Sequence, residues 1–305
     1  MNPAKNIIVI GGPTASGKTS LSIRLAKELN CPILSADSRQ FYSEMNIGTA
    51  KPNAKELAQA DHYFIGTKSI HEAYTVGDYE KESLELCTEL FKKHKTLILV
   101  GGSGLFIDAL TVGLNKFPFV PEDVKLEVQE LYEKNGLNYI QEKLKKEDPE
   151  YHAIVDLQNP ARIMRALTIT TSTDKTFSYY RNQELPIRSF QSKYFALDWE
   201  RTSLYNRIND RVDQMMLNGL YEEAEGLYTN RKLAALQTVG YQELFKAMEQ
   251  KISLEDAIEL IKRNTRRYAK RQMTWLRRES KYILLQTNND QTIEKAAHEI
   301  LNYIR

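Results

Sequence analysis

Short apolar runs alternate with longer amphipathic stretches in the first part of the chain. The apolar runs predict β-strands at residues 6–10, 32–36, 63–67 and 96–100. Between the strands, apolar positions recur at helical spacing, for example from 84 to 91. Strands that alternate with helices are typical of a parallel sheet with helices on both faces, so we expect an α/β fold of this kind.

The pattern changes to charged amphipathic helix from about Phe117. Two apolar stripes follow, formed by Val124, Val128 and Leu131 and by Leu137, Ile140 and Leu144. Asn159 directly before Pro160 predicts a helix start, because asparagine caps helices and proline suits the first turn. This helix is expected to end at about Thr170, and the whole segment is typical of a helical insertion.

The chain is expected to return to the sheet with a strand at 193–199. From Leu204 onward the pattern is almost entirely helical, with breaks at Gly219 and Gly240. We therefore expect an α/β core whose first part covers 1–116. A helical insertion should cover 117–190, and residues 191–305 should complete the core and end in a helical, basic region.

The first predicted strand leads directly into a phosphate-binding motif of the form G-x-x-x-x-G-K-T. The motif consists of Gly12, Pro13, Thr14, Ala15, Ser16, Gly17, Lys18 and Thr19. Its glycines let successive backbone N–H groups turn toward a phosphate, and the following helix adds the positive end of its dipole. In this pattern Lys18 would neutralise phosphate oxygens and Thr19 would hold Mg²⁺.

Two further strands end in candidate chemistry at the same edge of the sheet. The second strand is followed by Asp37-Ser38-Arg39-Gln40, where Asp37 is a general base, a Mg²⁺ anchor or only a helix cap. The fourth strand ends in Gly101-Gly102-Ser103-Gly104, where a phosphate-loop nucleotide hydrolase usually carries an acid. Bare backbone and the Ser103 hydroxyl instead suit close approach by a substrate and a hydrogen bond to a leaving oxygen.

Charge is unevenly distributed along the 305 residues, although the formal net charge is only +2. The stretch 262–281 holds nine basic residues and one acid, Glu279, so the rest of the chain is acidic. This favours a polyanionic partner such as nucleic acid over a merely solvated helix face. Two arginine pairs, Arg162 with Arg165 and Arg207 with Arg211, each share a helix face, either as ligand contacts or as ordinary surface positions.

Cysteine use and hydropathy limit the remaining possibilities. Cys31 and Cys87 are isolated, so neither a zinc site nor a disulfide framework is indicated. His62 and His152 are isolated too and are expected to be structural. No apolar run approaches the roughly 20 residues that cross a bilayer, and we expect a cytoplasmic protein without a membrane partner.

Taken together, these motifs resemble those of bacterial tRNA dimethylallyltransferases. The matching blocks, in order, are 12–19, 37–40, 48–52, 101–105, 159–162, 207–215, 237–241 and 265–277. The resemblance implies transfer of a dimethylallyl group from dimethylallyl diphosphate to the exocyclic amine of the adenosine just 3′ of a tRNA anticodon. It implies Mg²⁺ as cofactor, Asp37 as proton acceptor, and Lys18, Thr19 and Ser103 acting on the diphosphate.

The resemblance also implies a set of RNA-binding residues. They are Asp37, Ser38, Arg39, Gln40, Ser103, Lys125, Ala161, Arg162, Ile163, Met164, Arg165, Gln237, Thr238, Val239, Gly240, Tyr241, Gln242, Lys270, Arg271, Gln272, Trp275 and Arg277. Two positions depart from the family, which commonly has threonine in place of Ser103 and tyrosine in place of Phe106. Nothing in the sequence demands a partner subunit, so a monomer is expected.

Two other functions fit parts of the pattern. A phosphate-loop small-molecule kinase that uses ATP would explain the loop, but not the basic helix or the acid-free fourth strand. An RNA-binding module with a vestigial loop would explain the basic helix, but not the intact Lys18 and Thr19.

Overall fold

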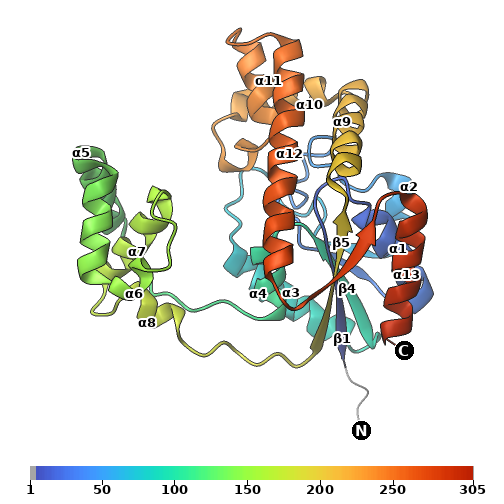
Figure 1. Cartoon of the computed structure of the whole chain (residues 1–305), viewed down its shortest axis with the longest axis horizontal. Coiled ribbons are helices and arrows are strands. Elements are labelled where there is room, and N and C mark those ends of the chain that lie inside the picture. Colours follow the sequence, from blue (N-terminus) through green and yellow to red (C-terminus); the bar gives the residue numbers. More distant parts are fainter. Residues whose placement is uncertain (1–4, 305) are drawn as a thin grey trace. The chain divides into compact units, whose positions relative to one another are not determined.

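A computed structural model describes residues 5–304 and contains one six-stranded parallel sheet (Figure 1). The strand order is β3-β2-β4-β1-β5-β6. The strands are β1 (Asn6–Gly11), β2 (Ile33–Ser35), β3 (His62–Tyr63), β4 (Thr96–Gly101), β5 (Gln191–Trp199) and β6 (Tyr282–Thr287). Every neighbouring pair is parallel, so all carboxyl ends lie at one edge. The expected α/β fold is confirmed.

Two details of the expected strands are wrong. The strand expected at 63–67 ends at Tyr63, because Phe64 and Gly66 adopt left-handed backbone angles, with φ of 63° and 62°. The expected strands also lack β6, an edge strand that pairs with β5, although the chain after Leu204 is otherwise helical as expected. Its short apolar run comes directly after a long helix, so periodicity alone does not distinguish it from more helix.

Helices cover both faces of the sheet (Figure 1). They are α1 (Lys18–Leu29), α2 (Ala54–Leu57), α3 (Val76–Leu90), α4 (Gly104–Thr111), α9 (Arg201–Leu217), α10 (Leu220–Leu227), α11 (Tyr241–Met248), α12 (Leu254–Arg278) and α13 (Asp290–Ile304), with short 3₁₀ turns at Tyr228–Asn230 and Ala234–Leu236. α1 and α13 contact each other beside the sheet, and α3 contacts α4. A cluster of buried apolar side chains joins α9, α10, α11 and α12, so these four helices pack together.

The chain divides into two compact units. The sheet and its helices form the first, which reaches to Thr111 and resumes at Arg188. The second, Val112–Ile187, contains α5 (Glu122–Glu147), α6 (Pro149–His152), α7 (Pro160–Ser172) and α8 (Phe177–Arg181). Gly136 interrupts α5 with φ 77° and ψ −178°, which separates the two apolar stripes. Asp148 is buried in this unit, where it accepts hydrogen bonds from the backbone N–H and hydroxyl of Ser178.

Candidate active site

The phosphate loop lies where β1 ends and α1 begins. Gly17 has φ 86°, and a Cβ at this position would come within 2.4 Å of the Ile293 side chain, so only glycine fits. Ala15 also adopts a left-handed conformation, with φ 63°, which is uncommon for a residue with a side chain. No side chain caps the start of α1, which leaves its first N–H groups to an anion.

Three cationic side chains converge on this loop. Arg207 donates from Nε to the Ala15 carbonyl at 3.0 Å, and Arg211 donates to the Thr14 hydroxyl at 3.3 Å. Lys18 donates from Nζ to the Pro13 carbonyl at 2.7 Å. The sequence had left open whether the Arg207 and Arg211 face meets a ligand, and its position beside the loop indicates a polyanion site.

The Arg207 guanidinium is held in place from its second side. It lies 4.7 Å from the centre of the Trp199 ring, and the Trp199 indole N–H donates to the Ser16 carbonyl at 3.0 Å. Ser16 has a buried hydroxyl that makes no hydrogen bond among the described residues. A bound ligand with an oxygen atom that accepts a hydrogen bond would give that hydroxyl a partner.

Burial shapes the protonation of these groups. Desolvation lowers the pKa of Lys18 to about 8, with the nearby Asp37 carboxylate acting in the opposite direction and Arg211 reinforcing the shift. Burial also lowers the pKa of Arg211, again partly offset by Asp37. A buried cation binds phosphate strongly, because the phosphate oxygens take the place of the water molecules that burial has removed.

Asp37 lies in the turn that follows β2. Its Oδ1 accepts the Arg39 backbone N–H at 3.1 Å, and its own N–H donates to the Ser35 hydroxyl at 3.3 Å. Asp37, Lys18 and Ser38 line one cavity of about 830 Å³. Asp37 therefore shares a cavity with the phosphate loop.

The predicted loop and turn residues meet in this cavity. The lining includes Thr14, Ala15, Ser16, Gly17, Lys18, Thr19, Asp37, Ser38, Arg39, Gln40, Thr238, Val239, Gly240 and Gln272. Ser103 is not among the lining residues, but its side chain lies beside Tyr268, which lines the cavity. The apolar part of the wall includes Ile208, Val212 and Met215 of α9.

Two of the residues expected around the target base make contacts within the protein. The Gln40 amide donates to the carbonyls of Thr49 and Ala50, both at 3.2 Å. The Arg39 guanidinium donates to the carbonyls of Ala234 and Ala235 at 3.1 and 2.8 Å. Both side chains tie the turn after β2 to neighbouring loops, so they support the position of Asp37.

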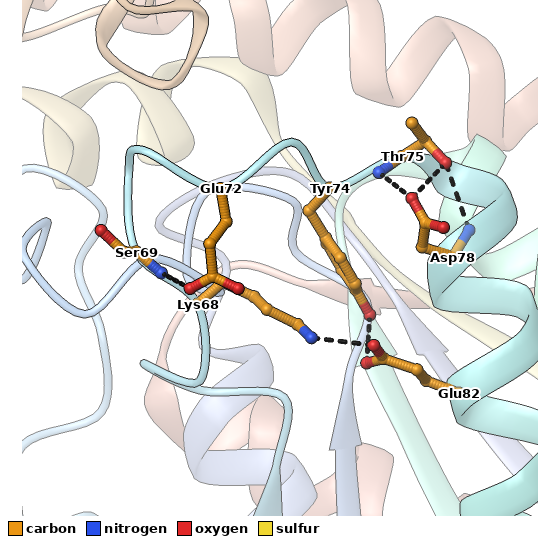
Figure 2. Close-up of polar contacts among 7 residues, drawn as sticks. All are labelled: Lys68, Ser69, Glu72, Tyr74, Thr75, Asp78 and Glu82. Atoms are coloured by element: carbon orange, nitrogen blue, oxygen red, sulfur yellow. Dashed lines mark hydrogen bonds and ion pairs between the residues drawn. The ribbon is translucent and has the colours of Figure 1, made fainter.

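A polar and aromatic cluster surrounds Phe41, which directly follows this turn in the sequence. Figure 2 shows Glu82 of α3 accepting from Lys68 at 2.8 Å and from the Tyr74 hydroxyl at 2.9 Å. Phe41 packs on Tyr74, on Tyr79 and on Phe106, with ring centroids 5.4 Å apart in each case. Phe106, where the family commonly has tyrosine, therefore serves as a packing residue.

Figure 2 also shows the start of α3. The Thr75 hydroxyl caps the helix by accepting from the Asp78 N–H at 3.2 Å, and the Asp78 carboxylate accepts from the Thr75 N–H at 2.8 Å. In the loop before it, Glu72 accepts the Ser69 backbone N–H at 2.6 Å. These local bonds fix the loop that carries Lys68 and Tyr74.

Several residues expected to bind RNA have other roles in the structure. Tyr241 is fully buried and donates its hydroxyl to Glu223 at 2.7 Å. Gln272 is buried and bonded to two backbone groups, and Arg277 pairs with Asp198 at 2.6 Å. Ile163 is buried in the core of the second unit. Tyr241, Gln272 and Ile163 are therefore buried among contacts within the protein, whereas the Arg277 side chain is 54% exposed and stays accessible to RNA.

The remaining expected RNA contacts are accessible. Lys270, Arg271 and Trp275 line a shallow groove on α12, together with Arg267, Thr274 and Arg278. Gln237 and Gln242 hydrogen-bond each other at 2.6 Å beside the cavity entrance residue Thr238. In the second unit, Ala161, Arg162 and Arg165 are exposed on α7 and Met164 is half-buried, while Lys125 pairs with Glu122 at 2.7 Å.

The site also suits a metal bound with a diphosphate. No three His, Cys, Asp or Glu side chains form a metal-binding group within residues 5–304. Thr19 and the unsatisfied Ser16 hydroxyl both line the cavity at the loop. This donor set fits an ion that shares its ligands with phosphate oxygens rather than one held by the protein alone.

The parallel sheet, phosphate loop and convergent arginines define a phosphate-loop α/β protein that binds a phosphorylated ligand. The IPP transferase family model matches residues 40–279, so the chain belongs to the IPP transferase family. The tRNA dimethylallyltransferase of Flavobacterium psychrophilum is 49% identical over 278 residues, which cover 89% of this chain and 91% of that protein. The corresponding protein of Christiangramia forsetii is 50% identical over 273 residues, 90% of each chain.

Solved structures agree with this membership. The tRNA isopentenylpyrophosphate transferase of Bacillus halodurans matches with a TM-score of 0.71 and 34% identity, covering 98% of this chain and 96% of that one. A eukaryotic dimethylallyltransferase described as acting on tRNA matches with a TM-score of 0.80 and 25% identity, covering 98% of this chain and 80% of the other.

Proposed function

We propose that this chain transfers a dimethylallyl group from dimethylallyl diphosphate to the exocyclic amine of the adenosine 3′-adjacent to a tRNA anticodon. The observation that carries this proposal is the cavity that Asp37 and the phosphate loop line together. The names of the relatives, at 49% and 50% identity over about nine-tenths of the chain, give the same activity.

The proposed reaction is a substitution at the allylic carbon. The amine nitrogen forms a bond to that carbon, the carbon–oxygen bond breaks, and its electron pair leaves with the diphosphate. Asp37 takes the proton that the nitrogen loses, because its carboxylate lines the same cavity as the loop that binds the diphosphate. Lys18, Arg207 and Arg211 stabilise the charge that develops on the leaving diphosphate.

A divalent metal is expected with a diphosphate, and we propose that it is Mg²⁺ held by Thr19. When bound, the ion neutralises part of the diphosphate charge. The buried Ser16 hydroxyl supports a ligand at the loop, because it has no hydrogen-bond partner among the described residues and a bound diphosphate would supply one.

We propose that tRNA contacts the basic groove of α12 and the exposed face of α7. Lys270, Arg271, Arg162 and Arg165 are exposed, and arginine and lysine bind phosphates without sequence preference.

We also propose that the protein is cytoplasmic and that it acts as a monomer. No helix in the described part of the chain is both long and apolar enough to cross a membrane.

One assay tests the function. The protein is incubated with total tRNA and Mg²⁺, together with either ¹⁴C-dimethylallyl diphosphate or γ-³²P-ATP. We expect the carbon label to enter tRNA and the phosphate label to be transferred to nothing. Transfer of the phosphate label would support the kinase alternative, which no comparison supports. Binding of tRNA without transfer of either label would indicate a non-catalytic module.

A further inference from the structure

The inner face of α12 is moulded onto the glycine-rich turn that follows β4. Three residues at helical spacing face this turn: Tyr268 lies beside Ser103, Gln272 contacts Gly102 and Trp275 packs on Gly104. A Cβ at Gly102 would lie 2.2 Å from the Gln272 amide nitrogen, and one at Gly104 would lie 2.4 Å from the Trp275 ring. The turn therefore needs glycine at both positions because α12 occupies the space.

Gln272 extends this contact to the phosphate loop. Its Oε1 accepts the Thr14 backbone N–H at 3.0 Å, and its Nε2 donates to the Gly102 carbonyl at 2.9 Å. The side chain is 8% exposed, so water does not replace these bonds easily. A single neutral amide thus connects three segments that are far apart in the sequence.

The outer face of the same helical turn is open and adjoins the inner face at Trp275, which borders both. Lys270, Arg271 and Thr274 are exposed and line the basic groove. RNA bound in that groove would restrict the motion of α12, and Gln272 would pass this restriction to the backbone of the phosphate loop. A loop that is already ordered loses less entropy when it binds a second ligand.

We propose that Gln272 is a positioning residue that couples RNA binding on the outer face of α12 to diphosphate binding at the phosphate loop. This inference rests on the proposed function. It predicts a sign: bound tRNA tightens diphosphate binding, even though direct repulsion between two polyanions would weaken it.

The test measures the affinity of inorganic diphosphate with Mg²⁺ for the full chain by calorimetry, with and without saturating tRNA. In the unaltered protein we expect tRNA to tighten diphosphate binding at least about fivefold, a typical allosteric coupling. Gln272→Met preserves length and removes both hydrogen bonds, and should reduce the effect to less than about twofold. Gln214→Met, a change at an exposed position of α9, is the matched control and should keep the full effect.

A second variant guards against misfolding of the first. Gly102→Ala displaces the Gln272 amide and should reduce coupling in the unaltered background. In a Gln272→Ala background, where the space is vacant, it should have little further effect. A general loss of stability would lower the melting temperature and the active fraction but leave the ratio of the two affinities unchanged.

The result that overturns the inference is unchanged coupling in both Gln272→Met and Gly102→Ala, or unaltered protein in which tRNA does not tighten diphosphate binding. Unaltered protein that binds neither tRNA nor diphosphate would reject the proposed function and this inference with it.

Discussion

Glu223 is the residue whose replacement should most clearly loosen the loop beside Asp37. One carboxylate oxygen accepts the N–H groups of Asn46 and Ile47 at 2.9 and 2.8 Å. The other accepts the Gly48 N–H at 2.9 Å and the Tyr241 hydroxyl at 2.7 Å. Glu223→Gln keeps the shape of the side chain but offers one oxygen where the loop requires two.

The cost of this change follows from the best orientation that glutamine can adopt. Its oxygen can accept from Asn46 and Ile47, and its amide can donate to Tyr241, but the Gly48 N–H then faces another donor. One half-buried N–H without a partner costs about 1–3 kcal/mol, and loss of charge from the remaining bonds costs roughly 1 kcal/mol more. We expect the free energy of unfolding to fall by about 3 kcal/mol.

Catalysis should fall too, because the carbonyls of Thr49 and Ala50 in the same loop hold Gln40 in the turn of Asp37. A small displacement of a catalytic group costs about 10- to 100-fold in rate. Calorimetry should show a melting temperature lower by roughly 5–10 °C, and single-turnover prenyl transfer should slow by that factor. Glu222→Gln, at the exposed neighbouring position, is the control. Equal melting temperatures and rates for the two variants would refute the reasoning.

Four further predictions concern the site itself. Asp37→Asn should slow single-turnover prenyl transfer about 100- to 10,000-fold with little change in tRNA affinity, and a loss below about threefold would mean that another group accepts the proton. Because burial lowers the pKa of Lys18 to about 8, diphosphate affinity should fall as the pH rises from 7 to 9, and a Lys18→Ala protein should lack this dependence in a calorimetric pH series. The same shift makes the free energy of unfolding rise with pH between about pH 8 and 10.5, where the unfolded chain binds more protons than the folded one. Ser103→Ala should lower the rate and Ser103→Thr should preserve it if the hydroxyl acts through Tyr268, whereas equal rates would assign the position to backbone geometry. Replacing Lys270 and Arg271 by alanine should weaken all tRNAs alike and flatten the slope of log affinity against log salt by roughly 0.7–0.9 per lost contact, and filter binding with an unchanged slope would place the RNA elsewhere.

The parts of the site that the sequence predicts are those formed within one short segment. The phosphate loop needs only a strand, two glycines and a helix start, all of which lie between Asn6 and Leu29. Asp37 was predictable because parallel strands end at a common edge, whichever strands are neighbours. Neither inference depends on knowing which distant segment packs against the loop.

Contacts between distant segments are what the sequence left open. The spacing of Arg207 and Arg211 predicts a shared face, but only the packing of α9 beside the loop determines that the face meets a ligand. Arg162 and Arg165 share a face on α7 in the same way, and there Arg165 lies 5.8 Å from the Phe117 ring. A shared helix face therefore does not decide what two arginines contact; the element packed beside them does.

The uncharged residues of α12 make contacts that its basic composition does not predict. A basic stretch predicts phosphate contact for every cation in it, yet Arg277, although exposed, already pairs with the buried Asp198. Gln272 can accept from one backbone group and donate to another, which neither lysine nor arginine can do, because both only donate. A glutamine among cations therefore indicates a bond to backbone on the inner side of a helix. Its distance of four residues from Tyr268 and three from Trp275 places all three on the face that meets the phosphate loop and the Gly101–Gly104 turn.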